Sequence, residues 1–297
     1  MAEPTTRIWD GDTSTVYTLA GNWQGGVVPL VTDHVYFPAS NSNPVAGVDV
    51  DDVALGSFSV LAGYSGAMGS STAGKPTFVE IAATTVNFAG TGQTFLDVDT
   101  CTTMNVTAAT SGSAGLYGLN LAAGAGAAAI TTLNINLLSG QTVGIANIAG
   151  TTATVTNINI SGAGTVMLGS GLTTTTINVS GTGTVTIKCA YTTLTISGTA
   201  RVYHEGSGAA TTVNARESSH YYWNTTGTIT TLNQEGAAEV NWASGLQARA
   251  VTTWNRRGTG IVKGLSSLMT EGTFNNYGSL TGIDIGEHFV MTWSTLA

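Results

Sequence analysis

Apolar and polar positions alternate through most of this chain, and a four-residue pattern shows where the alternation repeats. The pattern, which we call the tetrad, reads Thr-Thr, an apolar residue, then Asn. Eight copies, one ending in Thr instead of Asn, lie at Thr84–Asn87, Thr102–Asn105, Thr131–Asn134, Thr175–Asn178, Thr192–Thr195, Thr211–Asn214, Thr230–Asn233 and Thr252–Asn255. Looser copies lie at Thr156–Asn159 and Gly272–Asn275. From Ile158 onward the apolar position advances by 19, 17, 19, 19, 22 and 20 residues, a period that indicates stacked repeats.

A second apolar position follows each of the later tetrads after a turn that contains glycine. It comes eight residues after the tetrad's own apolar residue, in the pairs Ile158 and Val166, Ile177 and Val185, Leu194 and Val202, Val213 and Tyr221, Leu232 and Val240, and Trp254 and Val262. Two strands joined by a bend therefore form one turn of a solenoid, which we call a rung. Because side chains alternate between the faces of a strand, the positions two residues further on also point inward. This predicts one inner stack made of Leu168, Ile187, His204, Trp223 and Trp242.

The fold class expected from this pattern is all-β, a parallel β-helix (β-solenoid) of roughly ten short rungs. Residues 1–47 lack the tetrad and hold four of the five prolines, so we interpret them as an N-terminal cap or attachment segment. Residues 48–83 are expected to form irregular first rungs, 84–283 the regular β-helix, and 284–297 a C-terminal cap.

The same alternation turns the tetrad's Thr and Asn outward, which predicts two uncharged ladders along one face. Stacked Asn side chains can hydrogen-bond to one another from rung to rung, so we expect a structural role. A flat array that orders water is the alternative.

Composition narrows the class of partner. Only 9% of the residues are charged, the formal net charge is −8 and the pI is near 4.7, which argues against nucleic acid as a ligand. The most apolar run, 119–130, is too short to span a bilayer, so no membrane partner is expected. Residues 1–4 show no export signal, and Cys101 and Cys189 are expected to be free thiols, which suits assembly in a cytoplasm.

Candidate chemistry is sparse. Glycan-cleaving β-helices use paired carboxylates, yet no acidic residue lies between Asp99 and Glu205. The remaining candidate is an outward patch in the later rungs that could bind a sugar, although an ordinary solvated face would look the same. It consists of Arg201, Tyr203, His220, Tyr222 and Glu239, with Asn241 beside them.

Metal and cofactor chemistry is not indicated by the sequence. The four histidines are scattered, with His204 expected to point inward and His220 outward, and no zinc or phosphate-binding motif is present. We therefore expect no cofactor and no enzymatic activity.

Two stretches of the first quarter of the chain resemble known families. Four short motifs are similar to the pattern that opens many bacterial surface β-helices, autotransporter passengers among them: Ile8–Gly11, Gly21–Trp23, Val28–Pro29 and Asp33–Tyr36. The stretches Leu55–Val60 and Gly63–Gly69 resemble a segment of virion structural proteins of tailed bacteriophages. The signal peptide and C-terminal barrel pattern of an autotransporter are not seen in this sequence, which favours the phage class.

The resemblance implies a capsid decoration or turret protein, assembled in the host cytoplasm and located on the virion surface. Its expected partners are the major capsid protein and two further copies of itself in a homotrimer. Attachment is expected to involve the residues that carry the N-terminal motifs: Trp9, Asn22, Trp23, Pro29 and Asp33. The alternative is a tailspike-like protein that binds or cleaves a host surface glycan.

Overall fold

The computed structural model describes residues 5–41, 43–45, 49–72, 75–112, 116–123, 130–242, 248–263 and 269–278. The chain divides into two compact units, Met1–Asn159 and Ile160–Ala297, each of which we describe by itself. Within the described residues of both units the structure is almost entirely β, with one short 3₁₀ helix. The expected C-terminal cap, 284–297, lies outside the described residues.

The first unit begins with short strands and continues with longer ones. Its elements are β1 (Thr6–Ile8), η1 (Ala20–Asn22), β2 (His34–Phe37), β3 (Asp49–Val60), β4 (Ser70–Thr72), β5 (Lys75–Thr77), β6 (Val79–Phe88), β7 (Thr94–Val106), β8 (Leu119–Ala122), β9 (Ile130–Leu137), β10 (Thr142–Ile145) and β11 (Ala153–Gly162), in which the unit boundary falls.

The second unit is more regular. Its strands are β12 (Thr165–Leu168), β13 (Leu172–Val179), β14 (Thr184–Ile187), β15 (Tyr191–Ile196), β16 (Arg201–His204), β17 (Ala210–Ala215), β18 (His220–Trp223), β19 (Ile229–Gly236), β20 (Glu239–Asn241), β21 (Arg249–Gly258), β22 (Val262–Lys263) and β23 (Met269–Asn276).

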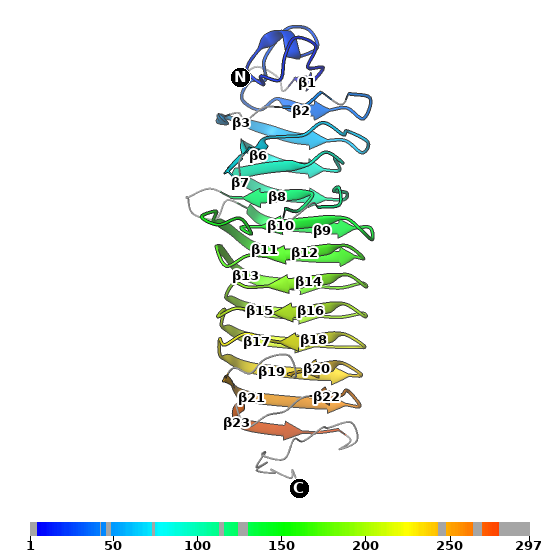
Figure 1. The fold of residues 1–297 in the computed structure, drawn as a ribbon, viewed down its shortest axis with the longest axis vertical. Coiled ribbons are helices and arrows are strands. Elements are labelled where there is room, and N and C mark those ends of the chain that lie inside the picture. Colours follow the sequence, from blue (N-terminus) through cyan, green and yellow to red (C-terminus); the bar gives the residue numbers. More distant parts are fainter. Residues whose placement is uncertain are drawn as a thin grey trace. The chain divides into compact units, whose positions relative to one another are not determined.

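Each unit is a parallel β-solenoid, as the sequence predicts. In the second unit the even-numbered strands β12 to β22 pair in parallel with one another, and the odd-numbered strands β13 to β23 do the same. Figure 1 shows these successive strands lying one above another, with the turns between them. A rung thus contributes one strand to each of two parallel columns.

The predicted register is confirmed in the second unit. The apolar residues of successive tetrads are direct partners and are all buried: Ile177, Leu194, Val213, Leu232, Trp254 and Phe274. Leu168, Ile187, His204 and Trp223 are likewise partners in turn, and the ring of Trp223 lies 3.8 Å from that of Trp242. The predicted inner stack is therefore present. Its five residues have little contact with solvent, because each is at most 4% exposed.

The first unit is less regular, and its parallel pairing starts earlier than the tetrads do. β1 already pairs in parallel with β2, and β2 with the end of β3, so the predicted cap segment 1–47 takes part in the ladder. Between β3 and β6 the chain inserts an antiparallel hairpin, β4 with β5, and the pairing of β3 with β6 contains a register shift. These interruptions fall within 48–83, where irregular rungs are expected.

The Asn residues of the tetrads form hydrogen-bonded ladders in both units. In the first unit each side-chain amide donates to the Asn one rung earlier, over 2.9 to 3.0 Å, in the series Asn159, Asn134, Asn105 and Asn87. In the second unit the same contacts span 2.8 to 2.9 Å in the series Asn275, Asn255, Asn233 and Asn214. This confirms the structural role, since one amide oxygen and one amide nitrogen of each inner Asn are used within the ladder.

Glycine with a positive φ occupies most of the tight turns that join the two columns. Gly198 has a φ of +69°, and a Cβ added there would lie 2.9 Å from the carbonyl oxygen of Gly181 in the preceding turn. Glu217 occupies the next turn with a φ of +59°, and its carboxylate accepts a hydrogen bond of 2.6 Å from the Gly198 N–H. Glu217 is exposed, and this contact joins its turn to the preceding one.

Candidate functional site

The predicted outer patch is assembled by β16, β18, β20 and β22. Arg201, His220 and Glu239 are partners at the first position of successive strands. Tyr203, Tyr222 and Asn241 are partners at the third position, and Lys263, the second residue of β22, is the partner of Asn241. Parallel pairing without a register shift brings these seven side chains onto one outer surface, which we call the outer patch.

The aromatic rings of the outer patch stack on one another. The rings of Tyr203 and Tyr222 are 4.4 Å apart with planes 7° from parallel, and the His220 ring lies 6.5 Å from Tyr222 at 15°. Facing surfaces of these rings are therefore occupied by their neighbours. The patch offers ring edges and phenol hydroxyls to a ligand, together with the exposed Arg201. Burial raises the pKa of Tyr222, with the charges of Tyr203 and Glu239 adding to the effect, so its hydroxyl stays protonated at neutral pH and can donate a hydrogen bond.

Glu239 is the electrostatic centre of the outer patch. Its carboxylate accepts hydrogen bonds from Lys263 Nζ at 3.0 Å and Asn241 Nδ2 at 3.3 Å, and His220 Nδ1 lies 3.6 Å away. Burial alone would raise the pKa of Glu239. The hydrogen bonds from Lys263 and Asn241 and the nearby charges of Lys263 and His220 outweigh burial, so this pKa is lowered. Glu239 is thus an ionised, paired carboxylate, and not a proton donor.

Lys263 is the one charged member of the outer patch that the sequence analysis did not name. The signal was present, because Val262 continues the row of second-strand apolar residues and Lys263 follows it on the outward side. The patch therefore contains one carboxylate against two permanent cations, Arg201 and Lys263. With no second acid among its seven residues, it lacks the carboxylate pair that hydrolysis of a glycosidic bond requires.

A different pair of acids is brought together in the first unit. Glu80 of β6 and Asp97 of β7 are direct partners, and both are partly exposed. Alternation around Val79 and Ile81, and around Leu96 and Val98, could have placed them on the same face. Their column continues with Ala122 in β8 on one side and with Asp49 in β3, the partner of Glu80, on the other.

The five predicted attachment residues are all buried in the first unit. Trp9 and Trp23 pack edge to face at 5.3 Å, and Pro29 is also inaccessible. Their burial leaves them little surface for direct contact with a partner. Any role that they have in attachment must come from shaping the segment around them.

Two buried polar residues show how this shaping works. The side-chain oxygen of Asn22 accepts hydrogen bonds from the Thr13 and Ser14 N–H groups at 2.9 and 2.7 Å, which closes the loop before η1. Asp33 accepts a hydrogen bond of 2.7 Å from Arg7 Nε and one of 3.0 Å from the Leu30 N–H. Burial alone would raise the pKa of Asp33, but these bonds lower it overall.

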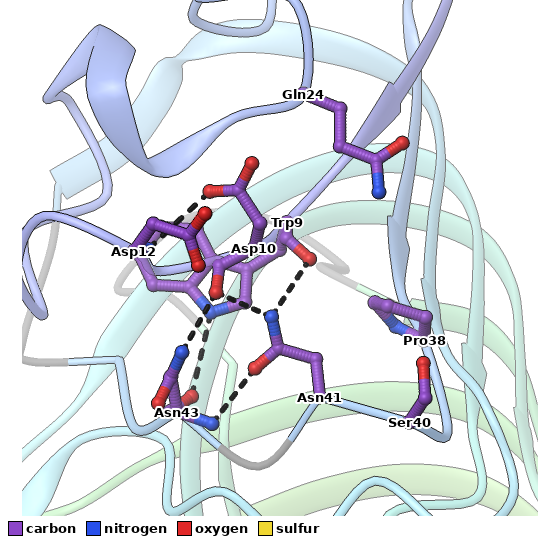
Figure 2. Close-up of a pocket in the computed structure, with 8 residues that line it drawn as sticks. All are labelled: Trp9, Asp10, Asp12, Gln24, Pro38, Ser40, Asn41 and Asn43. Atoms are coloured by element: carbon purple, nitrogen blue, oxygen red, sulfur yellow. Dashed lines mark hydrogen bonds between the residues drawn. The ribbon is translucent and has the colours of Figure 1, made fainter.

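An open, polar pocket of about 300 Å³ lies beside this framework (Figure 2). It is lined by Trp9, Asp10, Asp12, Gln24, Pro38, Ser40, Asn41 and Asn43. No pocket was predicted here from the sequence.

Buried titratable groups inside the second unit serve the structure. His204 is fully buried, and its Nδ1 lies 3.0 Å from the Tyr191 hydroxyl and 2.8 Å from that of Tyr221. Burial lowers the pKa of His204 to about 3, so it is neutral. Across the described residues, both cysteines are free and buried, no group of three or more His, Cys, Asp or Glu side chains is placed to hold a metal ion, and no helix is long and apolar enough to cross a membrane.

Comparison with known proteins adds no further constraint on this site. No protein-family model, no curated protein and no solved structure matches the chain. What the chain does must therefore be argued from its own residues and geometry.

Proposed function

We propose that this chain is a non-enzymatic structural protein of a virion exterior, which decorates or stabilises the capsid and is attached through its N-terminal end. The observation that carries the proposal is that the repeated residues are used by the fold itself. The apolar member of each tetrad is buried in the core of its rung, and the Asn builds a ladder whose amides hydrogen-bond to one another. A repeat whose side chains are engaged in this way favours a structural role over a catalytic one.

The resemblance of the N-terminal quarter to surface and virion β-helices supports the same proposal. Under it the partner is the major capsid protein, and assembly takes place in the host cytoplasm. A homotrimer is expected by analogy with other β-helical phage proteins.

The test is co-purification. Particles are isolated from the organism that encodes this chain on a density gradient, and each fraction is quantified by mass spectrometry. The proposal expects the chain to peak with the major capsid protein, in a ratio fixed by the lattice and divisible by three for a trimer. A chain found only in particle-free fractions would refute it.

The outer patch favours glycan binding as a second candidate function. Its stacked Tyr203 and Tyr222, with Arg201 at one edge, present hydroxyl and guanidinium donors that suit sugar hydroxyls or a sugar carboxylate. The single, paired carboxylate of Glu239 favours binding without cleavage.

Affinity electrophoresis in gels that contain host polysaccharide tests this second candidate. Retardation that is lost in Tyr222→Ala, without release of reducing ends, is expected. Release of reducing ends would contradict a binding-only patch. Glu239→Gln and Glu80→Gln would then show whether the outer patch or the acid pair of the first unit is responsible.

A further inference from the structure

The net charge of this protein is concentrated in its first third. Residues 1–99 hold ten acidic and two basic side chains, whereas residues 100–297 hold seven of each. The whole formal charge of −8 therefore belongs to the first 99 residues. A one-sided charge distribution of this kind steers association with a partner of opposite sign.

Within this acidic part, the pocket of Figure 2 places two carboxylates on a rigid turn. Gly11, between Asp10 and Asp12, has a φ of +59°, and a Cβ added to it would lie 2.7 Å from the Asn43 Cβ. The side-chain amides of Asn41 and Asn43 both donate to the Asp10 carbonyl oxygen, the latter at 2.7 Å. Among the described residues, the one hydrogen bond of an aspartate side chain in this turn is that of 3.4 Å which Asp10 Oδ1 accepts from the Asp12 N–H, so both carboxylates keep acceptor positions for a ligand.

No cation of the described chain neutralises these carboxylates. Arg7, the one basic residue described before residue 75, forms its ion pair with Asp33 at 2.7 Å. Neither Asp10 nor Asp12 takes part in an ion pair with any described residue. In Figure 2 they lie across the pocket from Gln24 and Ser40, which are polar but uncharged.

Exposed apolar side chains are concentrated in the same segment. Of the nine large hydrophobic residues exposed in the described chain, five lie within residues 16–31 and are 40 to 60% exposed: Val16, Leu19, Val27, Leu30 and Val31. Their neighbours Tyr17 and Trp23 are buried and rigidly packed, with rings 4.8 Å apart. Exposed apolar residues on a rigid support are typical of an interaction surface.

We propose that the N-terminal end binds a basic surface of a partner protein, with a Lys or Arg side chain of that partner entering the pocket between Asp10 and Asp12. The exposed apolar residues of 16–31 contact the partner around this charge. The identification of the partner as a capsid protein rests on the proposed function. The chemistry of the pocket does not, because it follows from the charges and contacts of this chain alone.

A cationic side chain fits this pocket better than a metal ion does. The Asn41 and Asn43 amide nitrogens point at the Asp10 carbonyl oxygen, and the Asn41 side-chain oxygen already accepts the Asn43 N–H at 2.8 Å. Only the two carboxylates are left as strong ligands, fewer than the six to eight oxygens that Ca²⁺ takes. A guanidinium or ammonium group needs only hydrogen-bond acceptors of opposite charge.

The first experiment tests the pocket without a partner. Acetyl-arginine amide is titrated into the full chain, and the indole N–H signal of Trp9, whose Nε1 donates to the Asn43 carbonyl oxygen at the pocket wall, is followed by NMR. We expect a saturable shift with acetyl-arginine amide and none with the uncharged acetyl-citrulline amide. The shift should be lost in Asp10→Asn/Asp12→Asn and kept in Asp99→Asn, an exposed acid of the same third of the chain. An equal response to citrulline, an unchanged response in the double variant, or a response to Ca²⁺ alone would overturn the proposal.

The second experiment uses purified capsid shells that lack the chain. Binding of Asp10→Asn/Asp12→Asn should be roughly two- to tenfold weaker than that of the original sequence and Asp99→Asn, with a smaller dependence on salt. If shells bind the double variant as well as the original, the docking proposal is wrong although the proposed function stands. If shells bind neither, while arginine amide still shifts Trp9, the proposed function is wrong and the pocket chemistry stands.

Discussion

The Asn ladder makes a prediction that can be worked from single contacts. In the second unit, Asn233 Nδ2 donates to Asn214 Oδ1 at 2.8 Å, and Asn255 Nδ2 donates to Asn233 Oδ1 at 2.9 Å. Asn233→Ala removes both hydrogen bonds, each worth about 0.5 to 1.5 kcal/mol. Because the side chain is partly exposed and water can replace part of the loss, we expect a destabilisation of about 1 to 2 kcal/mol.

Hydrogen exchange followed by mass spectrometry is the appropriate assay, since it reports the stability of each rung separately. A loss of 1 to 2 kcal/mol should speed exchange in peptides from β17, β19 and β21 roughly 5- to 30-fold. Thr230→Ala, at the exposed first position of the same tetrad, is the control and should change exchange little. If the two variants behave alike, the ladder does not stabilise the solenoid and the reasoning fails.

The ladder also predicts a stabilising substitution. Thr195 stands where the other tetrads have Asn, and Asn214 Nδ2 reaches its hydroxyl only at 3.4 Å. Thr195→Asn should shorten this contact to the length found elsewhere in the ladder. The free energy of opening of β15 and β17 should rise by about 0.5 to 1 kcal/mol, which slows their hydrogen exchange. Faster exchange in this variant would show that the Asn positions are not equivalent.

Three further outcomes are expected. Gly198→Ala should lower the free energy of unfolding by about 1 to 2 kcal/mol in urea titrations, and by more than Gly140→Ala, which has a φ of +83° but open space around it. Burial raises the pKa of Glu271 to about 7, so its contribution to stability is full below its ordinary pKa of 4.5 and is lost as the pH rises towards about 7. Glu271→Gln should reduce this loss of stability, which amounts to at most about 3 kcal/mol. Thermal unfolding measured at pH 5 and at pH 8 tests this. Burial raises the pKa of Cys101 to about 11 and of Cys189 to about 12, so a thiol reagent at pH 8 should label both only after unfolding, and rapid labelling of the native protein would contradict their burial.

The sequence predicts the regular part of the fold well because one local rule applies in every rung. Alternation around Val202 and Tyr221, for example, correctly places His204 inward and His220 outward. The rule works because a slip of one residue would expose every apolar side chain of a rung.

The same rule could have been applied to residues whose polarity argued against it. Two positions beyond Leu232 and Trp254 are Gln234 and Arg256, and both are buried. Arg256 is accommodated because its guanidinium donates to the Gly260 carbonyl oxygen at 2.6 Å and to Asn276 Oδ1 at 3.1 Å. One acceptor lies in a turn and the other in the next rung. The alternation within a single strand therefore cannot predict them.

The N-terminal segment could not be predicted in detail for a different reason. Its aromatic and polar residues were recognised as unlike the repeats, but no period indicates which of them are buried. Trp9 and Trp23, which were expected to contact a partner, are buried. Leu30 and Val31, which are also apolar, are exposed instead. Tertiary contacts decide this, since the hydrogen bonds of Asn22 and the Arg7–Asp33 ion pair join parts of the segment that are distant in the sequence.

Cryo-electron microscopy of particles purified from the source of this chain tests the central claim most directly. The account predicts solenoid density on the outside of the shell, with the β1 and β2 end and its Asp10–Asp12 pocket against a basic patch of the capsid protein. Particles without such density, or with the β1 and β2 segment turned away from the shell, would contradict it.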